Sequence, residues 1–444
     1  MSAPGRVFQR AGGIPPAAVR AEGTEIWDAA GKRYLDASGG ALVVNVGHGR
    51  ESIARVMAEQ ASRVAYAHGT VFTSESLEAY AAEVGPLLPL ESPALYPVSG
   101  GSEATETALK MARAYFLARG EPARTIVVAR WGSYHGNTLG ALDLSGRRPL
   151  RRPYEVWLGR FRHVSAAYPY RAGEPGAHAL GDTDELAAEL ERTILSEGPG
   201  TVAAFVAEPV VGATLGVVAP PPGYWDAIAD VCRRHGVLLV LDEVMTGFGR
   251  TGRWFGADNW GLRPDIVIAA KGAAGGYWPF GFTAAAGHVY QTIRDRGGFA
   301  HGFTFSHSIV GAAVAREVLR ILRAEDLVAA SARKGERLLA ALRRAFDGHP
   351  HAGDVRGMGL FAAVELVLDR ETKAPFPRDL GVVERALAAA RERGLLLYPG
   401  TGNANGIDGD IVMVGPPFVV TDEQIDEIAC GLREAVDRAV AKSV

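Results

Sequence analysis

Short apolar runs that alternate with helix-like segments are the feature of this sequence that most constrains its fold. The alternation begins near residue 95, and strand-like runs at 125–129, 202–206 and 237–241 are strongly apolar, with a helical pattern at 223–235. Strands and helices that alternate in this way form a mostly parallel sheet that is covered by helices. Ligands of such sheets bind beyond the carboxyl ends of the strands, so polar residues at those ends are candidates for a functional site.

Three chemically informative residues stand at such ends. Glu208 and Asp242 follow two of these runs, and Lys271 follows a further apolar run at 265–270. A lysine and an acid at strand ends suit pyridoxal 5′-phosphate, because the lysine amine can attach to the cofactor aldehyde while the acid holds the proton on the pyridine nitrogen. The apolar lead-in and the glycines after Lys271 argue against a solvated loop lysine. The sequence therefore predicts a pyridoxal phosphate site in which Lys271 and Asp242 are catalytic.

Two further segments can complete this site. Gly101 and Ser102 precede a helix expected at 105–118, where they can hold a phosphate group or simply cap the helix. Tyr134 follows a strand at 126–130 and can stack on a flat cofactor or cap the sheet. His135 either supports the site or satisfies a buried hydrogen bond, and we favour the second role over direct catalysis.

The rest of the chain suggests a second, smaller lobe. A hairpin is expected at 24–36, helices at 51–64 and 76–88, and a mixture of strands and helices from about residue 350 onward. We expect an N-terminal segment (1–64) that contributes to a small domain, a large cofactor-binding domain (65–325) and a C-terminal small α+β domain (326–444). The hairpin is expected to pack with the C-terminal domain.

Composition excludes several other classes of protein. The formal net charge of −3 argues against a nucleic-acid partner, and no apolar run approaches the roughly 20 residues that span a bilayer. Residues 1–16 lack the apolar core of a signal peptide. Cys232 and Cys430 are too few for a disulfide framework, and we expect both to be buried in helices. These features together favour a cytoplasmic protein.

Motifs in a fixed order give the chain a specific resemblance. They are Val98-Ser99-Gly100-Gly101-Ser102-Glu103-Ala104, Tyr134-His135-Gly136, Glu208-Pro209-Val210, the segment from Asp242 to Gly252, Lys271-Gly272, His301-Gly302-Phe303-Thr304-Phe305 and Arg356-Gly357-Met358-Gly359-Leu360. Together they resemble the class III aminotransferases of pyridoxal phosphate fold type I, over nearly the whole chain. That fold is α/β, with a large domain built on a mostly parallel sheet and a smaller α+β domain.

The resemblance implies a role for each candidate residue. Lys271 would hold the cofactor covalently and then move protons, and Asp242 would pair with the ring nitrogen. Thr304 would reach the phosphate in the neighbouring subunit, so that a homodimer is the minimal active unit. The remaining cofactor-binding roles would be phosphate binding by Gly101 and Ser102, stacking by Tyr134 and Val244 on the two ring faces, and support of the ring by the polar network of Glu208.

Two departures from other members resemble the ω-amino acid or amine:pyruvate branch. Ala213 stands where ornithine- and GABA-type members carry a glutamate, and Met245 stands where they carry a glutamine. The branch implies ping-pong transfer of an amino group from an ω-amino acid or amine to a keto acid such as pyruvate. The alternative is a lyase, decarboxylase or aminomutase of the same family, because the same cofactor can break different bonds.

Two interpretations outside this family have less support. A regulatory pyridoxal phosphate-binding protein would be preceded by a DNA-binding segment, which the sequence does not suggest. A nicotinamide oxidoreductase would need a Gly-x-Gly-x-x-Gly motif after an early strand.

Recognition of the substrate carboxylate is the open question. The branch usually places an arginine before the C-terminal Pro-Pro pair, and residues 398–410 contain none. Arg162 and Arg171 are candidates, although we favour a surface salt bridge as the role of each. Trp278 and Phe280, which follow the lysine, are expected to wall the pocket or to pack at the dimer interface.

Overall fold

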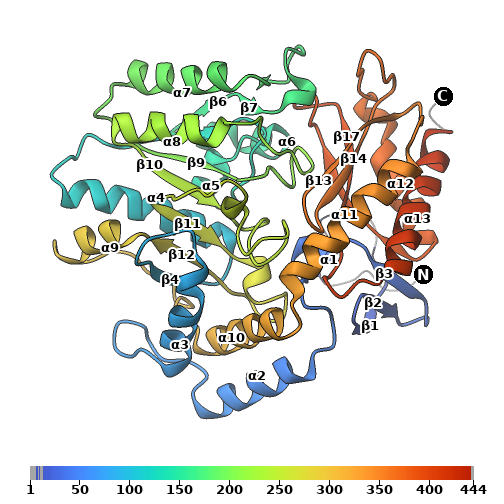
Figure 1. The fold of residues 1–444 in the computed structure, drawn as a ribbon. Helices are drawn as coiled ribbons and strands as arrows, with labels where there is room; N and C mark the ends of the chain where they lie inside the picture. Colours follow the sequence, from blue (N-terminus) through green and yellow to red (C-terminus); the bar gives the residue numbers. More distant parts are fainter. Residues whose placement is uncertain (1–6, 9, 11–13, 442–444) are drawn as a thin grey trace.

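The computed structural model describes residues 7–8, 10 and 14–441, which form a larger and a smaller sheet-centred region side by side (Figure 1). The larger region is built on a seven-stranded sheet. In spatial order its strands are β4 (Ala94–Val98), β12 (Gly281–Ala285), β11 (Ile266–Ala269), β10 (Leu238–Asp242), β9 (Val202–Ala207), β5 (Ile126–Arg130) and β6 (Arg162–Val164). Neighbouring strands are parallel except where β12 runs antiparallel to β11 and β4. The predicted mostly parallel sheet is confirmed.

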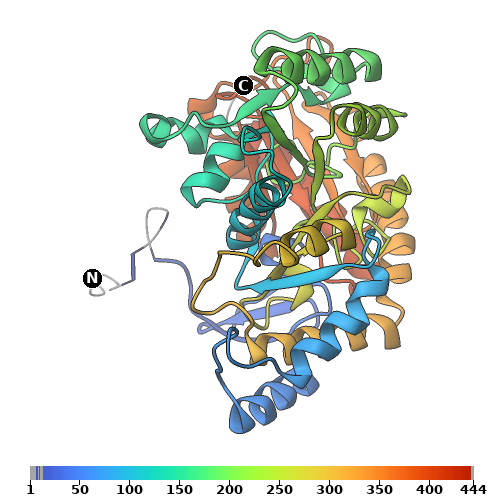
Figure 2. The same ribbon diagram turned by 90° about the vertical axis from the view of Figure 1, so that its left-hand side faces the viewer.

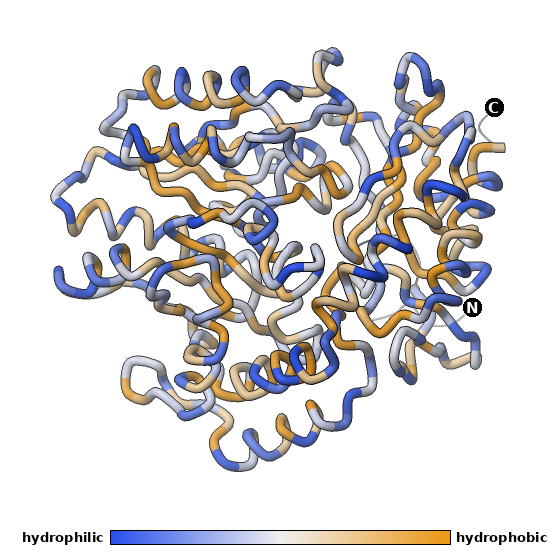
Figure 3. Tube along the Cα trace, in the orientation of Figure 1, coloured by the Kyte–Doolittle hydropathy of each residue, from blue (hydrophilic) through white to orange (hydrophobic). Residues whose placement is uncertain are grey.

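Helices cover both faces of this sheet. Helices α4 (Gly101–Ala118) and α9 (Gly287–Arg294) pack on one face, and α7 (Thr183–Glu197) and α8 (Tyr224–His235) pack on the other. Strand β10 shows the consequence, since Leu238 and Val240 pack with α4 while Leu239 and Leu241 pack with α7 and α8. A strand that is buried on both faces reads as a continuous apolar run. Figure 3 shows apolar residues along these strands and hydrophilic residues on the outward sides of the covering helices.

The smaller region contains an antiparallel sheet that is covered by the C-terminal helices. Its strands, in spatial order, are β13 (Ala352–Gly357), β14 (Ala362–Leu366), β17 (Asp410–Val414) and β16 (Tyr398–Thr401), and its helices are α11 (Leu327–Ala345), α12 (Val382–Glu392) and α13 (Asp422–Val440). Helix α13 begins at a reciprocal cap in which Gln424 N donates to Thr421 Oγ1 at 3.2 Å and Thr421 N donates to Gln424 Oε1 at 3.0 Å.

The N-terminal strands join this smaller region. The expected hairpin is present as β2 (Glu25–Asp28) and β3 (Arg33–Asp36), and β1 (Ala18–Glu22) extends it by one strand that the sequence did not indicate. Strand β3 pairs in parallel with β15 (Leu395–Leu396), so the hairpin packs with the C-terminal part as expected.

Three helices flank the lower end of the molecule. Helices α2 (Glu51–Arg63) and α3 (Glu75–Val84) lie beside α10 (Ile309–Ala324) in both views (Figure 1 and Figure 2). The short elements that remain are α1 (Gly39–Leu42), α5 (Leu139–Leu144), α6 (Arg148–Arg151), β7 (Ala166–Ala167) and β8 (Ala179–Leu180).

The two cysteines differ in environment. Cys232 is buried in α8, and burial raises the pKa of its thiol. Cys430 lies in α13 as expected but is exposed, so the expectation that both are buried was wrong for this residue. A cysteine on the outward side of an amphipathic helix has no apolar surroundings to enter. Among the described residues, no helix combines the length and the apolar character needed to cross a bilayer.

Candidate active site

The carboxyl ends of β9, β10 and β11 meet at a cavity of about 300 Å³. Glu208 follows β9, Asp242 ends β10 and Lys271 follows β11, so the sheet brings together the three residues that the sequence singled out. The cavity is lined by Val43, Ser99, Gly100, Gly101, Ser102, Tyr134, His135, Gly136, Glu208, Asp242, Val244, Met245, Ala270, Lys271, Trp278, Pro279 and Phe280. Its volume and its mixture of apolar walls with a few polar groups suit a small-molecule cofactor.

Lys271 begins a short 3₁₀ turn, Lys271–Ala273, and its backbone has a left-handed φ of +47°. A non-glycine residue in that region carries strain, which is found most often at functional sites. Burial lowers the pKa of the Lys271 amine to about 8, although the nearby carboxylates of Asp242 and Glu208 act in the opposite direction. The neutral, nucleophilic form of the amine is therefore far more populated near neutral pH than it is for an ordinary lysine.

Asp242 is fixed by two hydrogen bonds and is only 4% exposed. Its Oδ1 accepts a hydrogen bond from the backbone N–H of Val244 at 3.0 Å, and its Oδ2 lies 2.7 Å from Nδ1 of His135. Because a carboxylate oxygen accepts, the proton of this second bond lies on Nδ1. His135 therefore satisfies a buried hydrogen bond, as favoured, and the partner in that bond is the site carboxylate.

Glu208 holds the segment that carries Tyr134. Its Oε1 accepts a hydrogen bond from the backbone N–H of Tyr134 at 3.0 Å, and its Oε2 accepts one from Gly212 N at 3.0 Å. Burial raises the pKa of this carboxyl. Tyr134 lines the cavity, so its ring position depends on a backbone contact that Glu208 provides.

The start of α4 forms a small polar cradle. The helix begins at Gly101, four residues before the predicted start, so free N–H groups of its first turn lie beside the cavity. Ser102 Oγ accepts a hydrogen bond from Asn137 N at 3.1 Å. Gly136 has φ +134°, and a Cβ at that position would lie 2.5 Å from Ser102 Oγ. A phosphate fits the donors at this helix start, and Lys271 and Asp242 line the same cavity, so the residues present fit pyridoxal phosphate.

The other predicted residues divide into two groups. Val244, Trp278 and Phe280 line the cavity, as expected for residues that flank or wall it. Thr304 is exposed and does not line the cavity of its own chain.

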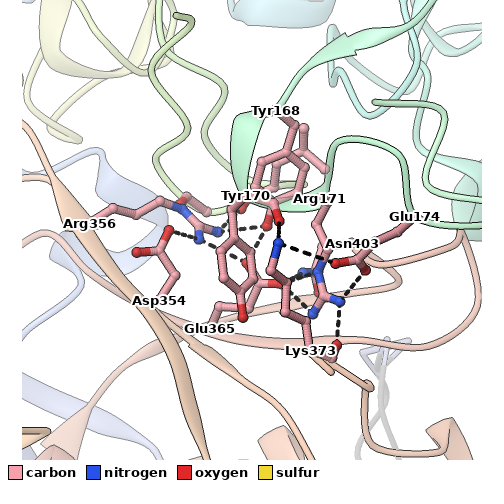
Figure 4. Close-up of polar contacts among 11 residues, drawn as sticks. Tyr168, Tyr170, Arg171, Glu174, Asp354, Arg356, Glu365, Lys373 and Asn403 are labelled. Carbon is pink, nitrogen blue, oxygen red and sulfur yellow. Dashed lines mark hydrogen bonds and ion pairs between the residues drawn. The ribbon is translucent and has the colours of Figure 1, made fainter. Parts of the chain in front are cut away.

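Neither arginine proposed for the substrate carboxylate lies in the cavity. Arg162 forms an ion pair with Glu197 at 2.5 Å, outside the site. Arg171 is fully buried, and Figure 4 shows its guanidinium among Glu365, Glu174 and the backbone of Lys373. Both candidates were wrong for this role, because acidic side chains already occupy their donors.

Sequence reasoning also missed residues that the fold brings to the site from elsewhere. Val43 belongs to the N-terminal part of the chain, and no motif marks it. Arg147 lies just outside the cavity lining, in an arginine-rich run, 147–152, whose side chains range from buried to exposed without a sign of this in the sequence.

Known proteins resemble this chain over almost its full length. The aminotransferase class-III family model matches residues 8–436. The putrescine–pyruvate aminotransferase of Pseudomonas aeruginosa is 34% identical over 424 residues, which cover 95% of this chain and 90% of that protein.

Solved structures agree with this match. A thermostable (S)-enantioselective omega-transaminase from Thermomicrobium roseum is 40% identical with a TM-score of 0.88, and the match covers 97% of this chain and 93% of that one. The omega transaminase from Pseudomonas jessenii in complex with PMP is 34% identical with a TM-score of 0.89, and the match covers 96% of this chain and 93% of that one.

These matches confirm the family resemblance, the α/β fold, the cofactor and amino transfer to a keto acid as the reaction. The chain belongs to the class-III aminotransferases, which are pyridoxal phosphate enzymes of fold type I.

Proposed function

We propose that this protein transfers an amino group from an ω-amino acid or another primary amine to pyruvate or a similar keto acid, in ping-pong order. The observation that carries the proposal is the meeting of Lys271 and Asp242 in one cavity beside the start of α4. Similarity to a putrescine–pyruvate aminotransferase and to omega-transaminases supports this choice of donor and acceptor.

The site residues take separate tasks in this proposal. Pyridoxal phosphate, when bound, supplies an aldehyde carbon and an electron-withdrawing ring. Lys271 holds the cofactor and moves protons at the reacting carbon, since burial lowers the pKa of its amine and makes the neutral form more accessible. Asp242 would pair with the ring nitrogen, and His135 holds the carboxylate in place. The remaining tasks are phosphate binding by Gly101 and Ser102, flanking of the ring by Tyr134 and Val244, and support of the Tyr134 segment by Glu208.

The active unit in this proposal is a homodimer in which Thr304 reaches the neighbouring site. Exposed apolar side chains near Thr304 support self-association, and Phe305 is 67% exposed with its ring 6.3 Å from that of Tyr66. Phe72, which is 64% exposed, adds to the exposed apolar surface of this part of the chain. Sedimentation equilibrium should find the native protein as a dimer and Phe305→Asp shifted toward monomer; a monomeric native protein with full activity would refute the proposal.

Two further proposals concern the domain boundaries and the cellular location of the protein. We propose the division into 1–64, 65–325 and 326–444, which limited proteolysis can test by the positions of the first cuts. We also propose a cytoplasmic location, which cell fractionation can test.

Two measurements test the proposed reaction. Purified protein should show the absorbance band of covalently held cofactor, and borohydride should fix the cofactor to native protein but not to Lys271→Ala. An unchanged borohydride-trapped adduct in Lys271→Ala would refute the assignment of the lysine. Titration with amines, β-alanine, taurine and GABA should bleach the band in order of donor preference.

Product analysis separates transfer from the lyase, decarboxylase and aminomutase reactions. Amino transfer requires that one alanine forms from pyruvate for each donor amine consumed. Loss of donor without pyruvate would favour one of the other reactions.

A further inference from the structure

Arg147 is a half-buried cation for which the described part of the chain supplies no acidic partner. Its Nε is buried and has no hydrogen-bond partner there. Burial lowers the pKa of its guanidinium, and the other groups that act on this pKa are the phenols of Tyr398 and Tyr134 and the guanidinium of Arg10. A buried charge is normally paired with an opposite one, because desolvation is otherwise costly. The surroundings of Arg147 therefore lack an anion.

The segment before Arg147 is held beside the active site by a hydrogen bond and by close packing. Ser145 Oγ accepts a hydrogen bond from the backbone N–H of His135 at 2.8 Å. Gly146 packs so closely that a Cβ there would overlap the carbonyl oxygen of Arg130. The charge of Arg147 in turn acts on Tyr134, which lines the cofactor cavity. Arg147 does not line the cofactor cavity itself, but it lies on a closely packed segment that contacts His135, which does.

Arg147 also helps to line a small cavity of about 30 Å³. Thr401, which ends β16, and Asn403, from the segment that follows, line this cavity, and none of the described residues that line it is acidic. This segment belongs to the 398–410 stretch that contains no arginine. Arg148 lines the same cavity, and its Nη1 donates to the backbone carbonyls of Gly176 and Asn405. Arg147 differs from Arg148 in that its guanidinium donates no hydrogen bond to the described residues, and its Nε is buried.

We propose that Arg147 binds the carboxylate of the substrate and so selects keto acids and ω-amino acids over their uncharged analogues. The inference rests on the proposed function and names the substrate-recognition residue of that same site. A guanidinium offers two parallel N–H groups that match the two oxygens of a carboxylate. The phenols of Tyr134 and Tyr398, which lie within electrostatic reach of Arg147, leave the positive charge uncompensated until an anion binds.

Two amino acceptors, one with a carboxylate and one without, test whether Arg147 recognises this group. Pyruvate and acetaldehyde both present a carbonyl, and only pyruvate carries a carboxylate. Arg147→Met should lower kcat/KM for pyruvate about 10- to 100-fold, mainly through KM, while kcat/KM for acetaldehyde stays within about twofold. Arg147→Lys keeps the positive charge but lacks the planar pair of donors. Its kcat/KM for pyruvate should lie between those of native protein and Arg147→Met. Arg152→Met is the matched control, since Arg152 is exposed in the same run, and it should behave like native protein. An equal loss for both acceptors, or no loss for pyruvate, would overturn the proposal.

Binding without turnover gives a second measurement. Calorimetric titration of the holoenzyme with propanoate, which has a carboxylate and no carbonyl, should give a dissociation constant about 10- to 100-fold weaker in Arg147→Met than in native protein. Propanamide, which is uncharged, should bind the two proteins equally weakly. Unchanged propanoate affinity in the variant would refute the role of Arg147. If native protein binds propanoate through Arg147 yet forms no alanine from pyruvate, the proposed reaction fails while this inference stands.

Discussion

Arg171 and Glu365 form an ion pair at 2.7 Å in which neither side chain has any exposed area. Arg171 comes from the segment after β7, and Glu365 lies in β14 of the smaller sheet. Glu365 also accepts from Arg356 at 2.8 Å and from Tyr168, as Figure 4 shows. The two sheet-centred regions are therefore joined by buried charges as well as by apolar contact.

Loss of the carboxylate from this network should be costly. Glu365→Gln leaves the guanidiniums of Arg171 and Arg356 buried without their shared counter-charge, so the free energy of unfolding should fall by about 3–5 kcal/mol in urea titrations. The control is Arg234→Ala, which removes the partly exposed pair with Glu191 and should cost less than about 1 kcal/mol. Equal losses in the free energy of unfolding of Glu365→Gln and Arg234→Ala would contradict the importance of the buried network.

Neutralising Asp242 should impair turnover more than cofactor binding. Asp242→Asn keeps the size of the side chain but removes the charge that is proposed to pair with the ring nitrogen, so kcat should fall about 100-fold or more. His135→Asn should lower kcat less, because Asp242 keeps its charge and its bond from Val244. Steady-state rates alongside the cofactor absorbance band separate the two effects. A kcat within a factor of about two of native in Asp242→Asn would rule out its role.

A methyl group at position 136 should weaken the phosphate cradle. In Gly136→Ala the Cβ would lie 2.5 Å from Ser102 Oγ, so the start of α4 must shift and cofactor should dissociate more readily. Gly120→Ala is the matched control, since Gly120 also has positive φ (+77°) but no atom within 4 Å of its Cβ position. Equilibrium dialysis should find weaker cofactor retention in Gly136→Ala alone. Equal retention in the two variants would count against the cradle.

The amine of Lys271 should make the cofactor-free protein respond to pH. The neutral amine is the reactive form, so the rate of cofactor uptake should rise about tenfold per pH unit toward pH 8 and then level off. The folded pKa lies below the ordinary value of 10.5, so the unfolded chain binds more protons between these values and stability should rise with pH across that window. Stopped-flow absorbance and urea titrations check the two effects, and Lys271→Met should abolish both. A rate that is flat between pH 6 and pH 8 would be incompatible with this pKa.

The sequence predicted the structure best in the strands of the larger sheet, which are buried on both faces. Strands with both faces covered read as continuous apolar runs, and these runs correctly predicted that Asp242 and Lys271 lie at strand ends. The apolar pattern of a strand does not reveal whether it runs parallel or antiparallel to its neighbours. The antiparallel direction of β12 was therefore not predictable. Strand β1 escaped notice because its residues are mostly exposed at a sheet edge.

Charged residues were harder to assign. Arg171 reads as a surface residue in the sequence but is fully buried, since its partner Glu365 is distant along the chain. Arg147 differs from Arg148 and Arg152 only in what surrounds it, which depends on segments from both sheet-centred regions. The chemistry of the site could therefore be predicted from residue type and spacing, whereas recognition of the substrate depends on tertiary contacts.

The pairing of β3 with β15 has a consequence for synthesis on the ribosome. Every strand of the seven-stranded sheet lies between Ala94 and Ala285, so that sheet can assemble while the C-terminal residues are still being translated. Strand β3 is made early but must wait for β15, which begins at Leu395. During that interval one edge of the N-terminal hairpin stays unpaired, and an unpaired strand edge favours aggregation of the nascent chain.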